Sequence, residues 1–308
     1  NNTVGNYSVA IGRLALQDQN YGTSTDAYNV AIGYEAGKEI TSGIRNVIIG
    51  GLAGDLFTDA DFNVAVGHGA LSSDQLGSKS VAVGNGTLGA QAFSTATDVF
   101  NTAVGTNAGT SVTTGTQNTI VGGLAADALT VGIHNVALGY ASLTTDTKGS
   151  ASVAVGNEAL STQNFTTATD AYNVAVGDQA GKALTTGIQN VFIGGLAGDA
   201  LQAASDNVAV GYKALSADVG GQNNVAVGRQ ALETANVSSG NIYNTAVGAA
   251  AGQSVTTGIS NVILGGLAGD ALTDADFNVV VGRGALTADT LGSRTVSVGY
   301  ESLGAQNF

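Results

Sequence analysis

The chain has 308 residues, of which 46 are glycine and none is proline, cysteine, methionine or tryptophan. Without cysteine it has no disulfide framework and no thiolate metal site, and its apolar runs fall short of the ~20 residues of a membrane-spanning helix. The net charge of −13, from 23 acidic and 10 basic residues, disfavours nucleic acid and anionic membranes as partners.

A five-residue pattern recurs along the whole chain: Asn or Ser, then Val, a small residue, an aliphatic residue and Gly. Its first copies are Ser8–Gly12 and Asn29–Gly33. The glycines that close it are Gly12, Gly33, Gly50, Gly67, Gly84, Gly105, Gly122, Gly139, Gly156, Gly177, Gly194, Gly211, Gly228, Gly248, Gly265, Gly282 and Gly299. Valine and threonine suit a pleated surface, so each copy predicts a short strand.

The spacing of these glycines predicts the fold class. They are 17 residues apart except at every fourth interval, which is four residues longer, or three in the last case. The larger unit therefore spans about 72 residues and recurs near 12–83, 84–155, 156–227 and 228–298. We expect an all-β chain, a parallel β-roll or β-solenoid of about 17 coils, forming one continuous domain over 1–308. Both ends fall inside a repeat, so we expect a segment of a longer fibre.

The alternation within each strand predicts its two faces. We expect the Val or Thr and the residue before Gly to stack as the aliphatic interior. The middle residue, usually Ala, then faces the other way, where neighbouring chains are expected to meet. Bulky residues replace Ala in the same coil of each 72-residue unit, and we expect them to pack between chains: Ile48, Ile120, Phe192 and Ile263. This second apolar face predicts a homo-oligomer, and we expect a homotrimer.

Asparagine opens the pattern in thirteen of the seventeen coils. Stacked Asn side chains can hydrogen-bond along a stack of strands. Alternatively, Asn is there because it favours the bend before the strand. Neither explanation implies a binding site.

The residues of the pattern also resemble those of known fibres. Ser152–Ala159, which reads SVAVGNEA, resembles the repeat in the left-handed parallel β-roll heads of trimeric autotransporter adhesins. The longer coil, with Gly265–Asn278, more closely resembles repeat regions in tail fibres of marine phages. The resemblance covers essentially the whole chain. It implies a trimeric extracellular fibre, on a virion or a bacterial cell, that presents or constitutes an attachment site.

Catalytic groups are scarce. His68 follows a pattern glycine and His134 lies in a turn of another coil, so the two do not share a register. They cannot supply a Ser-His-Asp set or a His-based metal site. We therefore expect no enzymatic activity and no cofactor.

Calcium is the one metal worth considering. The paired aspartates Asp59 and Asp61, and again Asp274 and Asp276, have the oxygen ligands that Ca²⁺ prefers. The simpler interpretation is that they are solvated turn residues, because the other two repeats lack the pair.

Two sets of side chains are candidates for recognition. Large residues recur directly after the pattern glycine and are expected to be exposed, where they could bind a cell-surface glycan or protein receptor: Tyr34, His68, Tyr140, Tyr212, Arg229, Arg283 and Tyr300. The simpler interpretation is that this is an ordinary tolerant surface position. An aromatic residue also ends each insert, at Tyr28, Phe100, Tyr172 and Tyr243. These aromatics either project as knobs or, as we expect, fold back over the apolar edge.

The sequence thus predicts a structural fibre shaft or head of a surface attachment protein, as in a phage tail fibre or trimeric adhesin. The alternatives are a bacterial extracellular filament and an ice-binding or glycan-binding β-solenoid without a viral role. An ice-binding face would require regular ranks of threonine, whereas the threonines here are paired in turns, as at Thr113–Gly115.

Overall fold

The computed structural model describes residues 5–307, which form a parallel β-solenoid with no helix among them. It has about 17 coils of roughly 17 residues, as the sequence predicts. A coil here is the chain from one pattern to the next. Each coil contributes one three-residue strand, made of the three residues that precede the pattern glycine.

The chain divides into two compact units. The first unit consists of residues 5–152 with 164–169, and the second of 153–163 with 170–307. The coil strands of the first unit are β2 (Val9–Ile11), β4 (Val30–Ile32), β5 (Val47–Ile49), β6 (Val64–Val66), β8 (Val81–Val83), β10 (Thr102–Val104), β11 (Thr119–Val121) and β12 (Val136–Leu138). Those of the second unit are β14 (Val153–Val155), β16 (Val174–Val176), β17 (Val191–Ile193), β18 (Val208–Val210), β20 (Val225–Val227), β22 (Thr245–Val247), β23 (Val262–Leu264), β24 (Val279–Val281) and β25 (Val296–Val298). That the chain forms one continuous domain over 1–308 stays a prediction.

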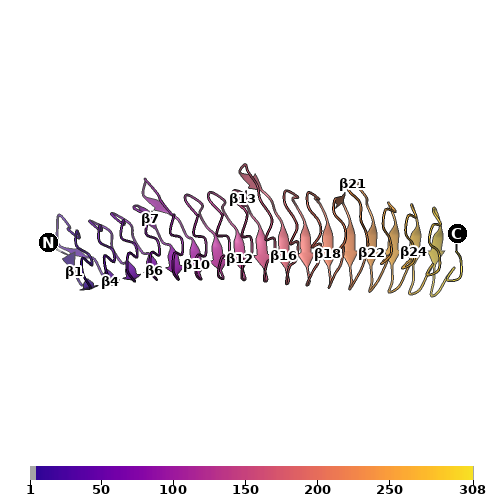
Figure 1. Ribbon diagram of the computed structural model, residues 1–308, viewed down its shortest axis with the longest axis horizontal. Coiled ribbons are helices and arrows are strands. Elements are labelled where there is room, and N and C mark those ends of the chain that lie inside the picture. The colour runs from indigo at the N-terminus through magenta and orange to yellow at the C-terminus, as the bar shows by residue number, and fades with distance from the viewer. Residues whose placement is uncertain (1–4, 308) are drawn as a thin grey trace. The chain divides into compact units, whose positions relative to one another are not determined.

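Within each unit the strands pair in parallel and without offset. Ala31 of β4 lies opposite Ile48 of β5, for example, so equivalent positions stack in columns. Figure 1 shows β4, β6, β10 and β12 following one another along this stack. The N–H of Gly50 donates to the carbonyl of Ile32 at 2.8 Å, and similar bonds join successive coils. Every sequence position therefore becomes a column with a step of roughly 4.8 Å.

The structure corrects the predicted faces of the strand. The middle residue points into the coil, where Ala31 and Ala65 are fully buried, and the two flanking residues point outward. Ile48, Ile120, Phe192 and Ile263 are likewise 0% exposed, so the prediction that they pack between chains is wrong. A three-residue strand that is apolar on both faces gives no alternation from which to choose the interior.

Glycines on the opposite wall explain the bulky residues. A Cβ added at Gly181 or at Gly198 would lie 2.6 Å from the ring of Phe192. Ile48 sits in the same way against Gly37. In coils that have Ala in the strand and no bulky residue in the strand of the next coil, a buried leucine such as Leu71 or Leu88 lies on that wall. Large and small residues thus alternate across the interior to keep it filled.

The asparagines form a hydrogen-bonded column inside the coil. The N–H of Asn118 donates to the side-chain oxygen of Asn101 at 2.9 Å, and the side-chain amide of Asn118 donates to the carbonyl of Gly132 at 2.9 Å. Where Ser80 replaces Asn, Gln91 fills the gap: its amide nitrogen lies 3.2 Å from the Ser80 hydroxyl, and its oxygen accepts from Asn101 at 3.0 Å. The column predicted as one of two alternatives is confirmed.

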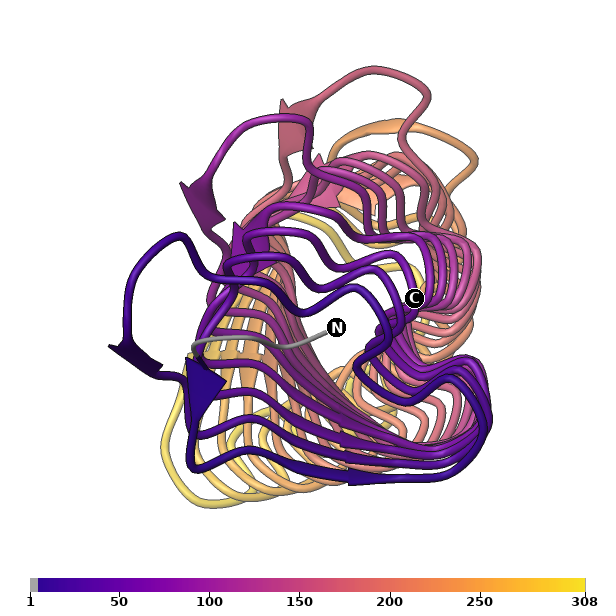
Figure 2. The same cartoon turned by 90° about the vertical axis from the view of Figure 1, so that its left-hand side faces the viewer.

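The longer coils carry the inserts, each marked by a two-residue bridge. The bridging strands are β1 (Gly5–Asn6), β3 (Thr25–Asp26), β7 (Gly77–Ser78), β9 (Thr97–Asp98), β13 (Gly149–Ser150), β15 (Thr169–Asp170), β19 (Gly221–Gln222) and β21 (Gly240–Asn241). In the first unit β1 pairs with β3 and β7 with β9. Figure 2 shows the loops at these bridges standing out from the coils.

Candidate functional surface

Four columns of side chains point outward from the strands of each unit. In the coil of β4 they are Tyr28, Val30, Ile32 and Tyr34, while Asn29 and Ala31 between them are fully buried. We call the column of Tyr28 the leading border, those of Val30 and Ile32 the aliphatic columns, and that of Tyr34 the trailing border. Together they form the outer face.

The aliphatic columns make a continuous apolar stripe on each unit. Ile193 is 41% exposed and Val247 is 40% exposed, although both belong to strands paired on both sides. The polar members are Thr102, Thr119 and Thr245. Isolated apolar residues are common on protein surfaces, but a long contiguous stripe marks a surface that interacts.

The predicted recognition residues all lie exposed in the trailing border: Tyr34, His68, Tyr140, Tyr212, Arg229, Arg283 and Tyr300. The guanidinium of Arg13 lies 5.6 Å from the ring centre of Tyr34, and Arg283 lies 5.8 Å from that of Tyr300. A Cβ at Gly123 would lie 3.8 Å from the ring of Tyr140. Because glycines separate them, these aromatics do not form a continuous array.

The leading border is richer in contacts, and only part of it is predicted from the sequence. Tyr28, Phe100, Tyr172 and Tyr243 lie here, about half exposed, so the expectation that they fold back over the apolar edge is wrong. Phe62, Phe277 and Arg45 share the column. Their identical place before the Asn was the signal in the sequence that could have found them.

The charge of the outer face is opposite to that of the molecule. Its borders carry six of the ten basic residues and only two of the 23 acidic ones. The basic members are Arg13, Arg45, Lys79, Arg229, Arg283 and Arg294, and the acidic ones are Asp178 and Asp206. An acidic protein thus presents a basic, aromatic-edged face.

The calcium candidates are acceptors for the preceding coil. Asp61 accepts from the N–H of Ile44 at 2.7 Å, and Asp59 from the Ser42 hydroxyl at 2.7 Å. In the equivalent turn of the second unit, Asp276 accepts from the N–H of Ile259 at 2.8 Å and Asp274 from the Thr257 hydroxyl at 2.6 Å. Residues 5–307 contain no group of three or more His, Cys, Asp or Glu side chains that could hold a metal ion. The two histidines lie in opposite borders, and His134 pairs with Gln117.

One further set of aspartates was not anticipated. Asp74, Asp146, Asp218 and Asp289 are fully buried and recur once per 72-residue repeat. Asp74 accepts from the N–H of Gly77 at 3.0 Å and from the amide of Gln91 at 2.6 Å, which closes the turn before the insert. Burial raises the pKa of Asp74 and of Asp218. The recurring Asp-x-x-Gly spacing was the signal for these turns.

Three other carboxylates lack full pairing. One side-chain oxygen each of Asp55, Asp199 and Asp270 is buried without a hydrogen-bond partner, and burial raises the pKa of all three groups. In the register-equivalent Asp127 the hydroxyl of Thr144 supplies the partner. These side chains are only half-buried, and register-equivalent aspartates recur four coils apart, so they build no site.

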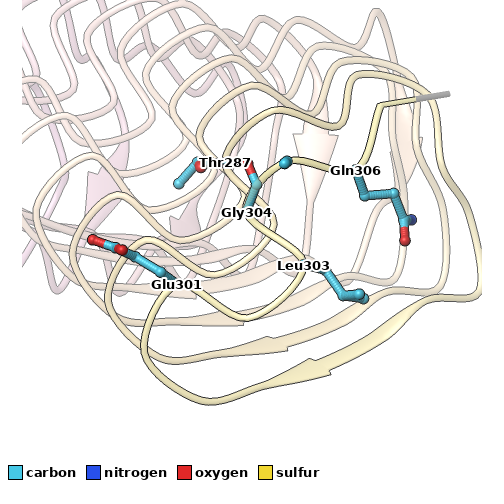
Figure 3. A pocket seen from close by; sticks show the side chains of 6 residues that line it. Thr287, Glu301, Leu303, Gly304 and Gln306 are labelled. Carbon is cyan, nitrogen blue, oxygen red and sulfur yellow. Dashed lines mark hydrogen bonds between the residues drawn. The ribbon is translucent and has the colours of Figure 1, made fainter.

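A hollow of about 610 Å³ is lined by Thr287 and, in the last described coil, by Glu301 and residues 303–306. In Figure 3 the side chain of Glu301 extends away from Gln306. Gln306 donates to the carboxylate of Asp289 at 3.0 Å. The hollow gathers no catalytic set.

Comparison with protein-family models, with curated proteins and with solved structures finds no match for this chain. Residues 5–307 include no helix with the length and apolar character to cross a membrane.

Proposed function

We propose that the chain is a structural segment of an extracellular attachment fibre, such as a phage tail fibre or bacterial adhesin, in which copies associate through the outer face. The observation that carries this proposal is the aliphatic stripe along both units. Backbone hydrogen bonds and the Asn column join successive coils. The described residues do not bring together a set of catalytic side chains. The chain therefore serves to set distance and to present a surface.

The stripe has the size and composition of an interface. Two columns about 10 Å wide over eight coils cover roughly 400 Å² per unit, and two units together roughly 800 Å². That equals the area each partner contributes to a standard protein interface, about 800 Å². The aliphatic columns supply an apolar centre, and the borders supply the polar and aromatic rim. A second copy of the same chain offers the matching apolar stripe.

The resemblance to trimeric fibres implies three copies. The buried Ala column no longer supports an interface, and the outer face takes over that role. A bacterial filament without a viral role stays an alternative, because it would use the same stripe.

Charged substitutions in the stripe test the proposal. The double variant Val66→Lys with Val210→Lys adds one cation to each unit at a position that is solvated in the single chain. Its matched control, Thr114→Lys with Thr186→Lys, adds the same charge at exposed turn positions. We expect the first variant to be monomeric by light scattering with unchanged circular dichroism, and the control to keep the wild-type mass. Equal masses for both variants would overturn the assembly.

A further inference from the structure

Aromatic and basic side chains follow one another along the leading border of the first unit. In order they are Tyr7, Tyr28, Arg45, Phe62, Lys79 and Phe100. The rings of Tyr7 and Tyr28 stack with centres 5.1 Å apart. The guanidinium of Arg45 lies 5.3 Å from the ring centre of Phe62, and the ammonium of Lys79 lies 5.3 Å from that of Phe100. We call this array the aromatic–basic ladder.

The backbone does not require such residues. All seventeen members of the leading border have a positive φ, between 49° at Tyr28 and 63° at Lys79. Glycine and asparagine adopt that conformation most easily, and bulky residues adopt it least. Yet seven members are aromatic, one is Asn and none is Gly. What these side chains present to solvent is therefore the reason for their presence.

The ladder favours an acidic ligand with flat apolar surfaces. Its rings are exposed by 43% at Phe62 and 49% at Phe100, so each offers apolar surface to a ligand. Asp98 pairs with Lys79 at 2.5 Å and offsets part of its charge. Among the described residues Arg45 forms no direct salt bridge and lies over the Phe62 ring, although the Asp61 carboxylate is near enough to interact with it electrostatically. Arg45 is thus the principal anion-binding group.

The spacing selects the class of ligand. Arg45 and Lys79 are two coils apart, as are Phe62 and Phe100, which corresponds to roughly 9.6 Å. An extended polysaccharide with one acidic sugar per disaccharide repeats on that scale. It offers the C–H face of one pyranose to each ring and a carboxylate to each cation. A single-stranded nucleic acid carries a phosphate on every nucleotide, and its denser charge is repelled by the net charge of −13.

We propose that the aromatic–basic ladder of the first unit binds an extended acidic polysaccharide that carries one carboxylate per disaccharide. Sugar rings stack on Tyr28, Phe62 and Phe100, and Arg45 pairs with a carboxylate. The ladder lies at the rim of the aliphatic columns and is complete within one chain, so binding requires no association of copies.

The test uses the full chain and hyaluronan oligosaccharides, which alternate an acidic and a neutral sugar, with binding measured by calorimetry. The variants are Phe62→Asn and Arg45→Asn. Because Asn suits a positive φ, each removes the ligand contact while relieving the backbone, and melting temperature verifies the fold. The matched control, Phe277→Asn, removes an aromatic of the same column in the second unit, where Arg294 is its single basic neighbour.

We expect each ladder variant to weaken binding on the order of tenfold, because one stacked or paired contact is lost. Binding to the control should equal that of the wild type, and added salt should weaken all of them. Three results would overturn the proposal: no binding of hyaluronan above that of a neutral cello-oligosaccharide, equal loss in Phe277→Asn, or tighter binding of oligo(dT), which would make the ligand a nucleic acid. Light scattering of the same samples measures the association of copies separately. A failure of polysaccharide binding is therefore distinguished from a failure of the proposed assembly.

Discussion

The backbone N–H of Asn46 donates to the side-chain oxygen of Asn29, 2.9 Å away in the preceding coil. The side-chain amide of Asn46 donates to the carbonyl of Ala60, 2.7 Å away in the turn that closes its own coil. Each buried Asn thus ties a strand start, a turn and a neighbouring coil together. Because these groups are shielded from water, losing one side chain orphans two buried backbone groups.

Asn118→Ala tests this column. The substitution leaves the N–H of Asn135 without its 3.0 Å acceptor and the carbonyl of Gly132 without its 2.9 Å donor. We expect a loss of about 2–4 kcal/mol in the free energy of unfolding by urea. Thr114→Ala, at an exposed turn position, should change it by less than about 0.5 kcal/mol. Equal effects of the two variants would contradict a structural role for the column.

The pattern glycines are required by both conformation and space. Gly67 has φ +137°, and a Cβ there would lie against the carbonyl oxygen of Gly84 in the next coil. Gly69, two residues later, has φ +65° and no atom within 4 Å of a Cβ. Gly67→Ala should cost more than the ~1–3 kcal/mol of conformational strain alone, and Gly69→Ala should cost about 1 kcal/mol. Thermal unfolding of the pair measures the difference, and similar melting temperatures would refute it.

The corrected position of Phe192 predicts that it stabilises the single chain. Phe192→Ala should cost about 3–5 kcal/mol through the cavity it leaves. Phe192→Ile introduces the residue found at the equivalent positions Ile48 and Ile120, and about 1 kcal/mol is expected. Neither variant should alter the molar mass. A lower molar mass in solution, with an unchanged free energy of unfolding, would instead support packing of Phe192 between chains.

Stability should rise on mild acidification. Burial raises the pKa of six carboxyl groups: Asp55, Asp61, Asp74, Asp199, Asp218 and Asp270. A group whose pKa is raised in the folded state favours folding below the ordinary value of about 3.9, and this contribution is lost as the pH rises through the raised value. The lowered pKa of Glu158, beside Lys182, acts in the opposite sense at an exposed site.

The urea midpoint is therefore expected to be higher near pH 4 than at pH 7. Asp218→Asn should reduce this dependence, because the amide oxygen can still accept from Gly221 and Val237 while the charge is gone. A midpoint that climbs toward neutral pH, as in ordinary acid denaturation, would contradict the assignment.

The sequence predicted the coil count and the parallel stack, because one glycine per coil marks a backbone conformation that only glycine adopts. It could not predict which face of the strand lies inside. In Val30–Ile32 all three residues are apolar, so hydrophobicity gives no direction. The decisive information is the fully buried Asn29, which shares its face with Ala31, and burial of a polar side chain follows only from the hydrogen bonds it makes.

The exposed trailing border was predicted as a column, because the position after the glycine varies in the sequence. The leading border was not, since the contact between Arg45 and Phe62 joins residues 17 positions apart in coils of variable length. Its members were noticed only where an insert made the aromatic conspicuous, as at Tyr28.

The central claim is that copies of this chain associate through the outward aliphatic columns, and the molar mass in solution tests it most directly. The single chain has a mass of 30.2 kDa. Light scattering of the purified chain should give three times that mass, and the Val66→Lys with Val210→Lys variant should return it to that of one chain with its β-rich circular dichroism intact. A wild-type chain that is folded, stable and monomeric over a wide range of concentrations would contradict the account.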